Sequence, residues 1–203
     1  MSLLKRLLNP IYKSERKAER AEKVQHSKYF PEKKLPIDEK FTYNFKNNGG
    51  KFIYCENWDE VLESFDNIML ENDWYEQDVF CVNEMLAKKF DGFNLNFTKS
   101  SDSTFFLSTC ESLVANNGSI LLSSNQVKEK KLNELPSNFI IFSTTSQIVD
   151  TISEGLRIIK SKSSGRIPSN ITTIHDFETD KEKDFMSHGS STKNIYLLLL
   201  EDL

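Results

Sequence analysis

Short apolar runs alternate with polar segments along most of the chain, and the clearest of them predicts a β-hairpin. Two apolar runs, Leu113–Ala115 and Ile120–Leu122, flank four residues suited to a turn: Asn116, Asn117, Gly118 and Ser119. Asn and Gly tolerate the positive φ that tight hairpin turns require, so Leu113–Ser124 is predicted to run strand, turn, strand. The turn is rich in hydrogen-bonding groups. It is either a plain hairpin turn or a loop that binds a small polar or anionic ligand.

The rest of the pattern predicts strands that alternate with amphipathic helices. Alternating or continuous apolar residues indicate strands at Phe41–Phe45, Lys51–Cys55, Phe93–Phe97, Asn138–Phe142, Ile171–Ile174 and Ile195–Leu200. Helical spacing of apolar residues indicates three helices. The first follows an N-cap at Asn57, and the others span Asp78–Phe90 and Ile148–Lys160. Trp74 is predicted to be a packing anchor between the first two helices. This order favours an α/β layered domain with a mixed sheet.

The first 34 residues differ in charge from the rest of the chain. Residues 1–34 carry ten Lys or Arg against four Glu, whereas the net charge of the whole chain is −4. Residues 1–34 are therefore predicted to form a basic helical arm, and residues 35–203 an acidic domain. The arm docks on its own domain, docks on a partner, lies on an anionic membrane surface, or frays. Nucleic-acid binding by the acidic domain is disfavoured electrostatically.

Composition indicates a folded protein that keeps its thiols reduced. The three cysteines, Cys55, Cys81 and Cys110, form no C-x-x-C pair, which predicts neither disulfides nor an iron–sulfur cluster held by this chain. No apolar run approaches the ~18–20 residues of a membrane-spanning helix, and the apolar start of the chain is too short and polar for a signal-peptide core. We expect a cytoplasmic protein.

Common catalytic fingerprints are absent from the sequence. Neither G-x-G-x-x-G, the phosphate-loop motif, H-E-x-x-H nor G-x-S-x-G occurs, and the three histidines are too scattered to predict a metal site. Glu111 and Asp176 are carboxylates near predicted strand ends, where α/β sites tend to form. His188-Gly189 precedes the final strand and is either a candidate ligand contact or a loop His before a turn. No cofactor, metal or catalytic residue is predicted.

Three segments resemble the LUD domain, the lactate-utilization family that includes LutC proteins. They are Thr109–Leu122, Leu135–Phe142, and His188-Gly189 ahead of Ile195–Asp202. The family hallmark reads roughly A-D-x-x-I-A-E-T-G-T, followed by an L-P strand entry and by H-G-P before a last apolar strand. The resemblance covers the chain from Thr109 onward. It implies a Rossmann-like α/β/α sandwich, similar to the NagB/RpiA/CoA transferase-like fold.

The resemblance also assigns candidate ligand-binding residues. Those that stand at matching or replaced positions of the family pattern are Glu111, Asn116, Asn117, Gly118, Ser119, His188 and Gly189. Asn116 replaces the Glu of the pattern, and an amide cannot take up a proton near neutral pH. Binding at the hairpin turn is therefore favoured over catalysis there.

Three functions remain open at the level of sequence. The first, implied by the resemblance, is an accessory or binding component of lactate or organic-acid utilisation that works beside iron–sulfur proteins. The second is an enzyme acting on a small carboxylate, a phosphosugar or an acyl-CoA, as the fold class would allow. The third is a non-catalytic interaction module whose basic arm, residues 1–34, docks on a partner.

Overall fold

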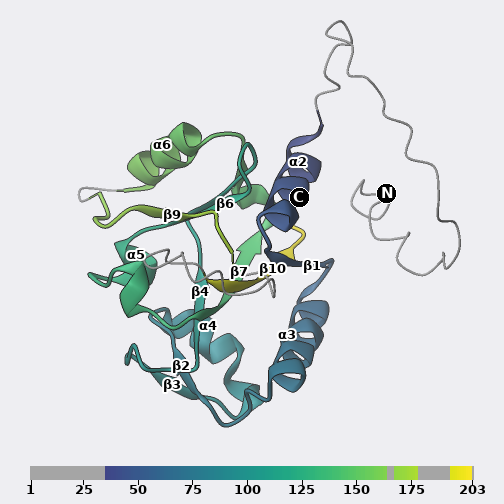
Figure 1. Ribbon diagram of the computed structural model, residues 1–203, viewed down its shortest axis with the longest axis vertical. Coiled ribbons are helices and arrows are strands. Elements are labelled where there is room, and N and C mark those ends of the chain that lie inside the picture. Colours follow the sequence, from purple (N-terminus) through teal and green to yellow (C-terminus); the bar gives the residue numbers. More distant parts are fainter. Residues whose placement is uncertain (1–34, 164–166, 178–192, 203) are drawn as a thin grey trace, which may run out of the picture.

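A central parallel sheet, sheet A, organises the fold. The computed structural model describes residues 35–163, 167–177 and 193–202, and within these ranges sheet A has six strands in the order β1-β10-β7-β4-β2-β3 (Figure 1). The strands are β1 (Lys51–Cys55), β2 (Asp78–Phe80), β3 (Asn96–Thr98), β4 (Phe105–Thr109), β7 (Asn138–Thr144) and β10 (Asn194–Leu200). All neighbours in the sheet run parallel. Their carboxyl ends therefore meet at one edge.

The predicted hairpin forms part of a smaller second sheet, sheet B. Its strands in the described part of the chain are β5 (Ser112–Val114), β6 (Ser119–Leu122), β8 (Ile148–Val149) and β9 (Thr172–Ile174), in the order β8-β5-β6-β9. β5 and β6 pair antiparallel, which confirms the strand–turn–strand prediction. β5 pairs with β8 in parallel and β6 with β9 antiparallel, so sheet B is mixed.

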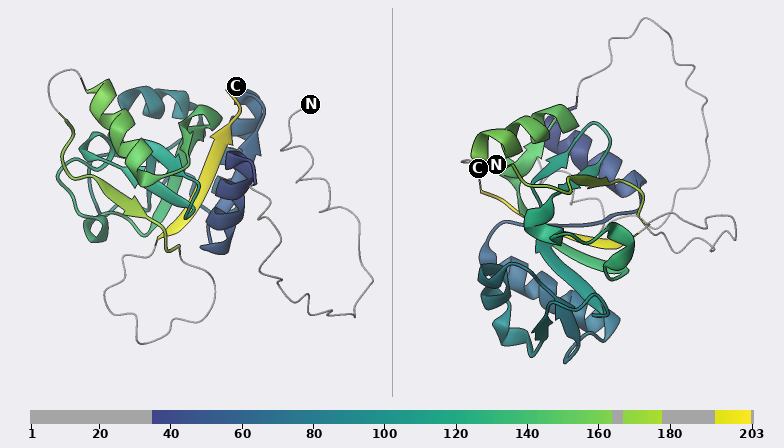
Figure 2. Two further views of the ribbon diagram at one scale, coloured as in Figure 1. Left: turned by 90° about the horizontal axis from the view of Figure 1, so that it is seen from above. Right: turned by 90° about the vertical axis from the view of Figure 1, so that its left-hand side faces the viewer.

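Helices flank the two sheets. The α-helices are α2 (Ile37–Asn47), α3 (Trp58–Asn72), α4 (Glu84–Lys89), α5 (Ser124–Val127) and α6 (Ile152–Lys162). Short 3-10 turns are η1 (Asp91–Phe93), η2 (Leu132–Glu134) and η3 (Thr145–Gln147). Figure 2 shows α3 and α4 on one side of sheet A, with sheet B, α2 and α6 on the other. The layers are therefore helix, sheet A, sheet B and helix.

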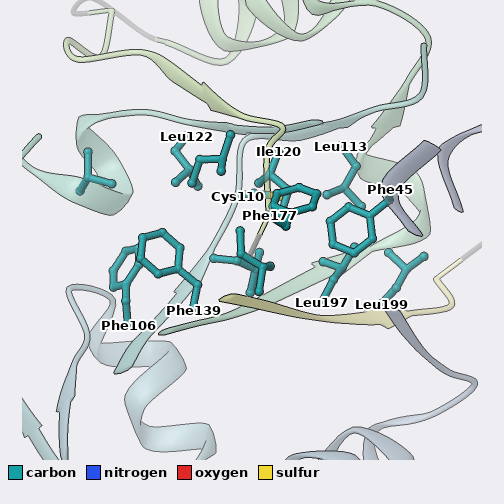
Figure 3. Packing of buried hydrophobic residues seen from close by; sticks show 14 of the residues in the cluster. Phe45, Phe106, Cys110, Leu113, Ile120, Leu122, Phe139, Phe177, Leu197 and Leu199 are labelled. Carbon is teal, nitrogen blue, oxygen red and sulfur yellow. The ribbon is translucent and has the colours of Figure 1, made fainter. Parts of the chain in front are cut away.

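Three apolar clusters hold these layers together. α3 and α4 bury side chains such as Phe65 and Leu86 against one face of sheet A. The opposite face of sheet A meets the hairpin and α2, and Figure 3 shows Leu113 and Phe45 turned towards Leu197. α6 covers the outer face of sheet B, where Ile159 joins the third cluster. At ~25 cal/mol per Å² of apolar area removed from water, this burial is the main force that holds the hairpin on sheet A.

Several predicted elements are confirmed by the structure. Asn57 caps α3, and its side-chain oxygen accepts a hydrogen bond from the backbone N–H of Glu60 at 3.0 Å. β10 lies between β1 and β7 and is buried along most of its length, as an interior parallel strand should be. Trp74 is 7% exposed and is a packing anchor, although its ring stacks on Phe105 of β4 rather than between two helices.

One predicted element was wrong, and two predicted helices are confirmed only in part. Phe41–Phe45 is helical within α2, because Phe41 and Phe45, four residues apart, share its buried face while Tyr43 is 62% exposed. The predicted helix at Asp78–Phe90 divides into β2 and α4, with Asn83 capping α4 through its side-chain oxygen. The predicted helix from Ile148 begins only after the Thr151 cap, because Ile148–Val149 pairs with β5.

The fold class agrees with the prediction, a Rossmann-like α/β/α arrangement with a parallel sheet. The predicted basic arm, residues 1–34, lies outside the described residues. No helix among the residues described is both long and apolar enough to cross a membrane.

Candidate functional site

The hairpin turn, residues 115–118, lies against helix α2. Asn44 of α2 donates a side-chain hydrogen bond to the carbonyl of Ala115 at 2.8 Å, and Asn48 donates to the carbonyl of Asn117 at 2.7 Å. Gly118 has a φ of +65°, which favours glycine. A Cβ at Gly118 would lie 2.4 Å from backbone atoms of both Asn44 and Phe45. The family-matched glycine therefore allows the turn to approach α2 closely.

The polar side chains of the turn largely satisfy one another. Asn117 Oδ1 accepts a hydrogen bond from the hydroxyl of Ser119 at 2.8 Å, and Ser119 is fully buried. Asn116 is exposed, and its backbone N–H donates to the carbonyl of Asp150 at 3.0 Å. The contacts of Gly118 and Ser119 thus stabilise the turn and its packing against α2. Ligand binding at the turn stays a prediction.

Glu111 lies just beyond the carboxyl end of β4 and holds the start of helix α5. Its Oε1 accepts a hydrogen bond from the hydroxyl of Ser123 at 2.6 Å and another from the side-chain amide of Asn125 at 2.9 Å. Ser123 is the N-cap of α5. Glu111 is partly buried. It positions the segment that follows the hairpin.

The other candidate site residues from the sequence lie away from the turn or outside the residues that the structure describes. Asp176 is exposed, with its carboxylate 3.2 Å from His175. His188 and Gly189 fall outside the described residues, so their role stays a prediction. The turn and Glu111 belong to one hairpin, but the structure brings neither together with Asp176 through any ion pair or hydrogen bond among the described residues.

A basic pocket opens at the carboxyl ends of β2 and β3. Its volume is about 510 Å³. We call this cavity the basic pocket. The residues that line it are Phe80, Val82, Asn83, Glu84, Met85, Lys99, Lys128 and Lys130. Three lysines against one glutamate give the lining an excess of positive charge. In open α/β sheets, ligands bind outside the carboxyl ends of the strands, which is where this pocket lies.

Hydrogen bonds fix the segment that carries two of the pocket lysines. Lys130 donates to the hydroxyl of Ser101, in the loop after β3, and its ammonium lies 5.7 Å from the centre of the Phe80 ring. The side-chain amide of Asn170 donates to the carbonyls of both Lys128 and Lys130, at 3.1 and 2.8 Å. Lys128 itself has φ 56° and ψ −134°, a region that is costly for any residue except glycine.

Two further polar groups at this edge of sheet A have shifted pKa values. Burial raises the pKa of the Asp202 carboxyl, but hydrogen bonds from Ser146, Thr144 and Thr145 outweigh it and lower that pKa to about 2. Burial raises the pKa of the Cys110 thiol to about 12, against a smaller lowering by its hydrogen bond to Ser143. Asp202 is thus an anion at neutral pH that would be a poor proton acceptor, and Cys110 is a poor nucleophile.

Among the residues that the structure describes, no group of three or more His, Cys, Asp or Glu residues is close enough to hold a metal ion.

The pocket lysines and Asn170 were not identified from sequence. The run Val127–Asn133 carried charge without periodicity, and its positive-φ lysine has no signature that local pattern reveals.

Together, the parallel sheet, the hairpin sheet on one face and a pocket at the carboxyl edge define a Rossmann-like α/β protein. The family model named "LUD domain" matches residues 94–202, more than half of the chain. The protein belongs to the LUD domain family. The match confirms the resemblance seen from Thr109 onward and begins somewhat earlier, at Asn94.

A solved structure has the same fold. It is the crystal structure of a DUF162 family protein from Deinococcus radiodurans, which is 12% identical to this chain. The similarity covers 82% of this chain and 96% of that one, with a TM-score of 0.56. No curated protein matches this chain. The structural comparison therefore supports the fold.

Proposed function

We propose that the protein is a binding component of lactate or related organic-acid utilisation and that it holds a small anionic ligand in the basic pocket. Membership of the LUD domain family supports the metabolic setting. The basic pocket supports the ligand class, since three lysines line a cavity of about 510 Å³ at the carboxyl edge of a parallel sheet. That pocket is the observation on which the proposal chiefly rests.

Binding rather than catalysis fits the polar groups of the hairpin turn and the buried thiols. Asn116 occupies the position of the family's Glu, and its amide has no proton-accepting role near neutral pH. The thiols of Cys110 and Cys81 have pKa values raised by burial to about 12 and about 11, which leaves them protonated. An accessory role beside iron–sulfur proteins, implied by the family resemblance, is part of the same proposal.

Direct titration tests the ligand class. Calorimetry on the full chain with L-lactate and with succinate should detect binding in the millimolar range, a free energy of about −4 kcal/mol. The double variant Lys99→Ala/Lys128→Ala should weaken binding about tenfold, because exposed charge pairs contribute up to about 1 kcal/mol each. Lys160→Ala, on α6 and outside the pocket lining, is the charge-matched control and should change nothing.

Gene deletion tests the metabolic setting. A strain without this chain should grow more slowly on lactate and consume it more slowly than the parent, with recovery on reintroduction of the gene. Unchanged growth and unchanged lactate oxidation would contradict the accessory role, whatever the pocket binds.

A further inference from the structure

The charge of the basic pocket exceeds what a single carboxylate neutralises. Its lining carries Lys99, Lys128 and Lys130 against the one carboxylate of Glu84. These side chains come from different parts of the chain: Lys99 follows β3, and the other two follow α5. A monocarboxylate such as lactate would leave excess positive charge in the pocket, whereas a ligand group with two negative charges would balance it.

The backbone of the lysine segment is held in place by contacts within the protein. Lys128 lies in a strained backbone region, and the amide of Asn170 bridges its carbonyl and that of Lys130. Lys130 is further tied to Ser101. Strain that surrounding contacts enforce is common at ligand sites, and a segment ordered in advance loses less entropy when it binds. The arrangement is thus suited to a fixed, compact anionic group.

The lining of the basic pocket also includes apolar side chains. Val82 and Met85 line it, and Met85 is 70% exposed. A methionine side chain is flexible and polarizable, so it adapts to ligands of different shape. A volume of about 510 Å³ also lies in the range of pockets that hold ligands far larger than lactate.

The geometry points to a ligand that joins a dianionic group, a phosphate monoester or a dicarboxylate, to an apolar body. The dianionic group lies among Lys99, Lys128 and Lys130, and the apolar body contacts Val82 and Met85. This inference rests on the proposed function, because it specifies the anion that the basic pocket binds.

Ligands that share an alkyl group and differ in their acidic head group test which ligand charge the basic pocket prefers. Titrations of the full chain at pH 8 and fixed ionic strength would compare n-butyl phosphate, n-butylmalonate and hexanoate. The dianions should bind about tenfold more tightly than hexanoate, and Lys99→Ala/Lys128→Ala should remove that advantage, whereas Lys160→Ala should keep it. Preference for only one of the two dianions supports the inference and identifies its head group.

Shortening the alkyl group tests the apolar lining. Methyl phosphate should bind about tenfold more weakly than n-butyl phosphate. Met85→Ser should reduce this difference in affinity by weakening the binding of n-butyl phosphate, and should leave the affinity for methyl phosphate unchanged.

Two outcomes separate this inference from the proposed function. If hexanoate binds as tightly as the dianions, and the lysine variant weakens every ligand equally, the dianion inference fails while the proposed function stands. If no acid responds to the lysine variant, the basic pocket is not the site and both fail.

Discussion

Replacing Gly118 by alanine probes the contact between the hairpin turn and α2. The added Cβ would lie 2.4 Å from the backbone carbon of Asn44 and from the backbone nitrogen of Phe45. Neither is the end of a flexible side chain, so the turn and the helix must move apart. The φ of +65° adds a backbone cost that glycine does not have.

The expected loss of stability follows from these two terms. A left-handed backbone costs a residue with a Cβ about 1 kcal/mol or more, and overpacking in a closed contact costs about 1–3 kcal/mol. The side-chain hydrogen bonds from Asn44 and Asn48 to the turn, worth about 1 kcal/mol each, would also be weakened. Gly118→Ala should therefore lower the free energy of unfolding by about 3 kcal/mol.

Urea denaturation followed by circular dichroism measures this loss. Gly92→Ala is the matched control, because a Cβ there meets no atom within 4 Å, and its stability should change by less than about 0.5 kcal/mol. A loss below about 1 kcal/mol for Gly118→Ala would falsify the close approach of turn and helix. Normal stability with lost ligand binding would instead identify the turn as a binding loop.

Three further predictions concern Lys128, Asp202 and the three cysteines. Lys128→Gly should be more stable than Lys128→Ala by about 1 kcal/mol in urea unfolding, since glycine accepts the strained backbone; equal stabilities would show that the strain is absent. The folded-state pKa of Asp202 is lowered to about 2 from 3.8, so its stabilising effect is present above about pH 4 and is lost as pH falls towards 2. Acid unfolding of Asp202→Asn should accordingly be less steep than that of the parent, and identical curves would count against the hydrogen-bonded carboxylate. The thiols of Cys55, Cys81 and Cys110 should react slowly with a disulfide reagent at pH 8 and quickly in urea, because all three are buried and their pKa values are raised; fast reaction of the folded protein would contradict this burial.

Elements with a strong local signal were predictable from sequence. The hairpin has two apolar runs around an Asn-Gly turn, and β10 is apolar throughout, so period and turn chemistry agree with the fold. α2 was missed because Phe41, Tyr43 and Phe45 fit a period of two as well as a helix does. Only packing on sheet A selects the helix, by burying Phe41 and Phe45 and leaving Tyr43 exposed.

The candidate site was less accessible to sequence reasoning than the fold. Glu111 was correctly identified as a polar residue at a strand end, but its partners Ser123 and Asn125 depend on how α5 folds back. The basic pocket brings together Lys99 and Lys128 from separate segments of the chain. Asn170, whose side-chain amide donates to the carbonyl of Lys128, lies in a third segment. No local spacing links these residues, because tertiary contacts alone bring them together.

The pairing of β1 with β10 has a consequence for synthesis of the chain on the ribosome. Lys51 is opposite Tyr196, so β1 leaves the ribosome long before its partner strand exists. At the usual rates of translation, that delay is on the order of 10 seconds, far longer than local helices take to form. During this interval the apolar residues of β1, α3 and β4 have no complete sheet to cover them. We expect β1 to stay unpaired in the nascent chain until β10 inserts between β1 and β7.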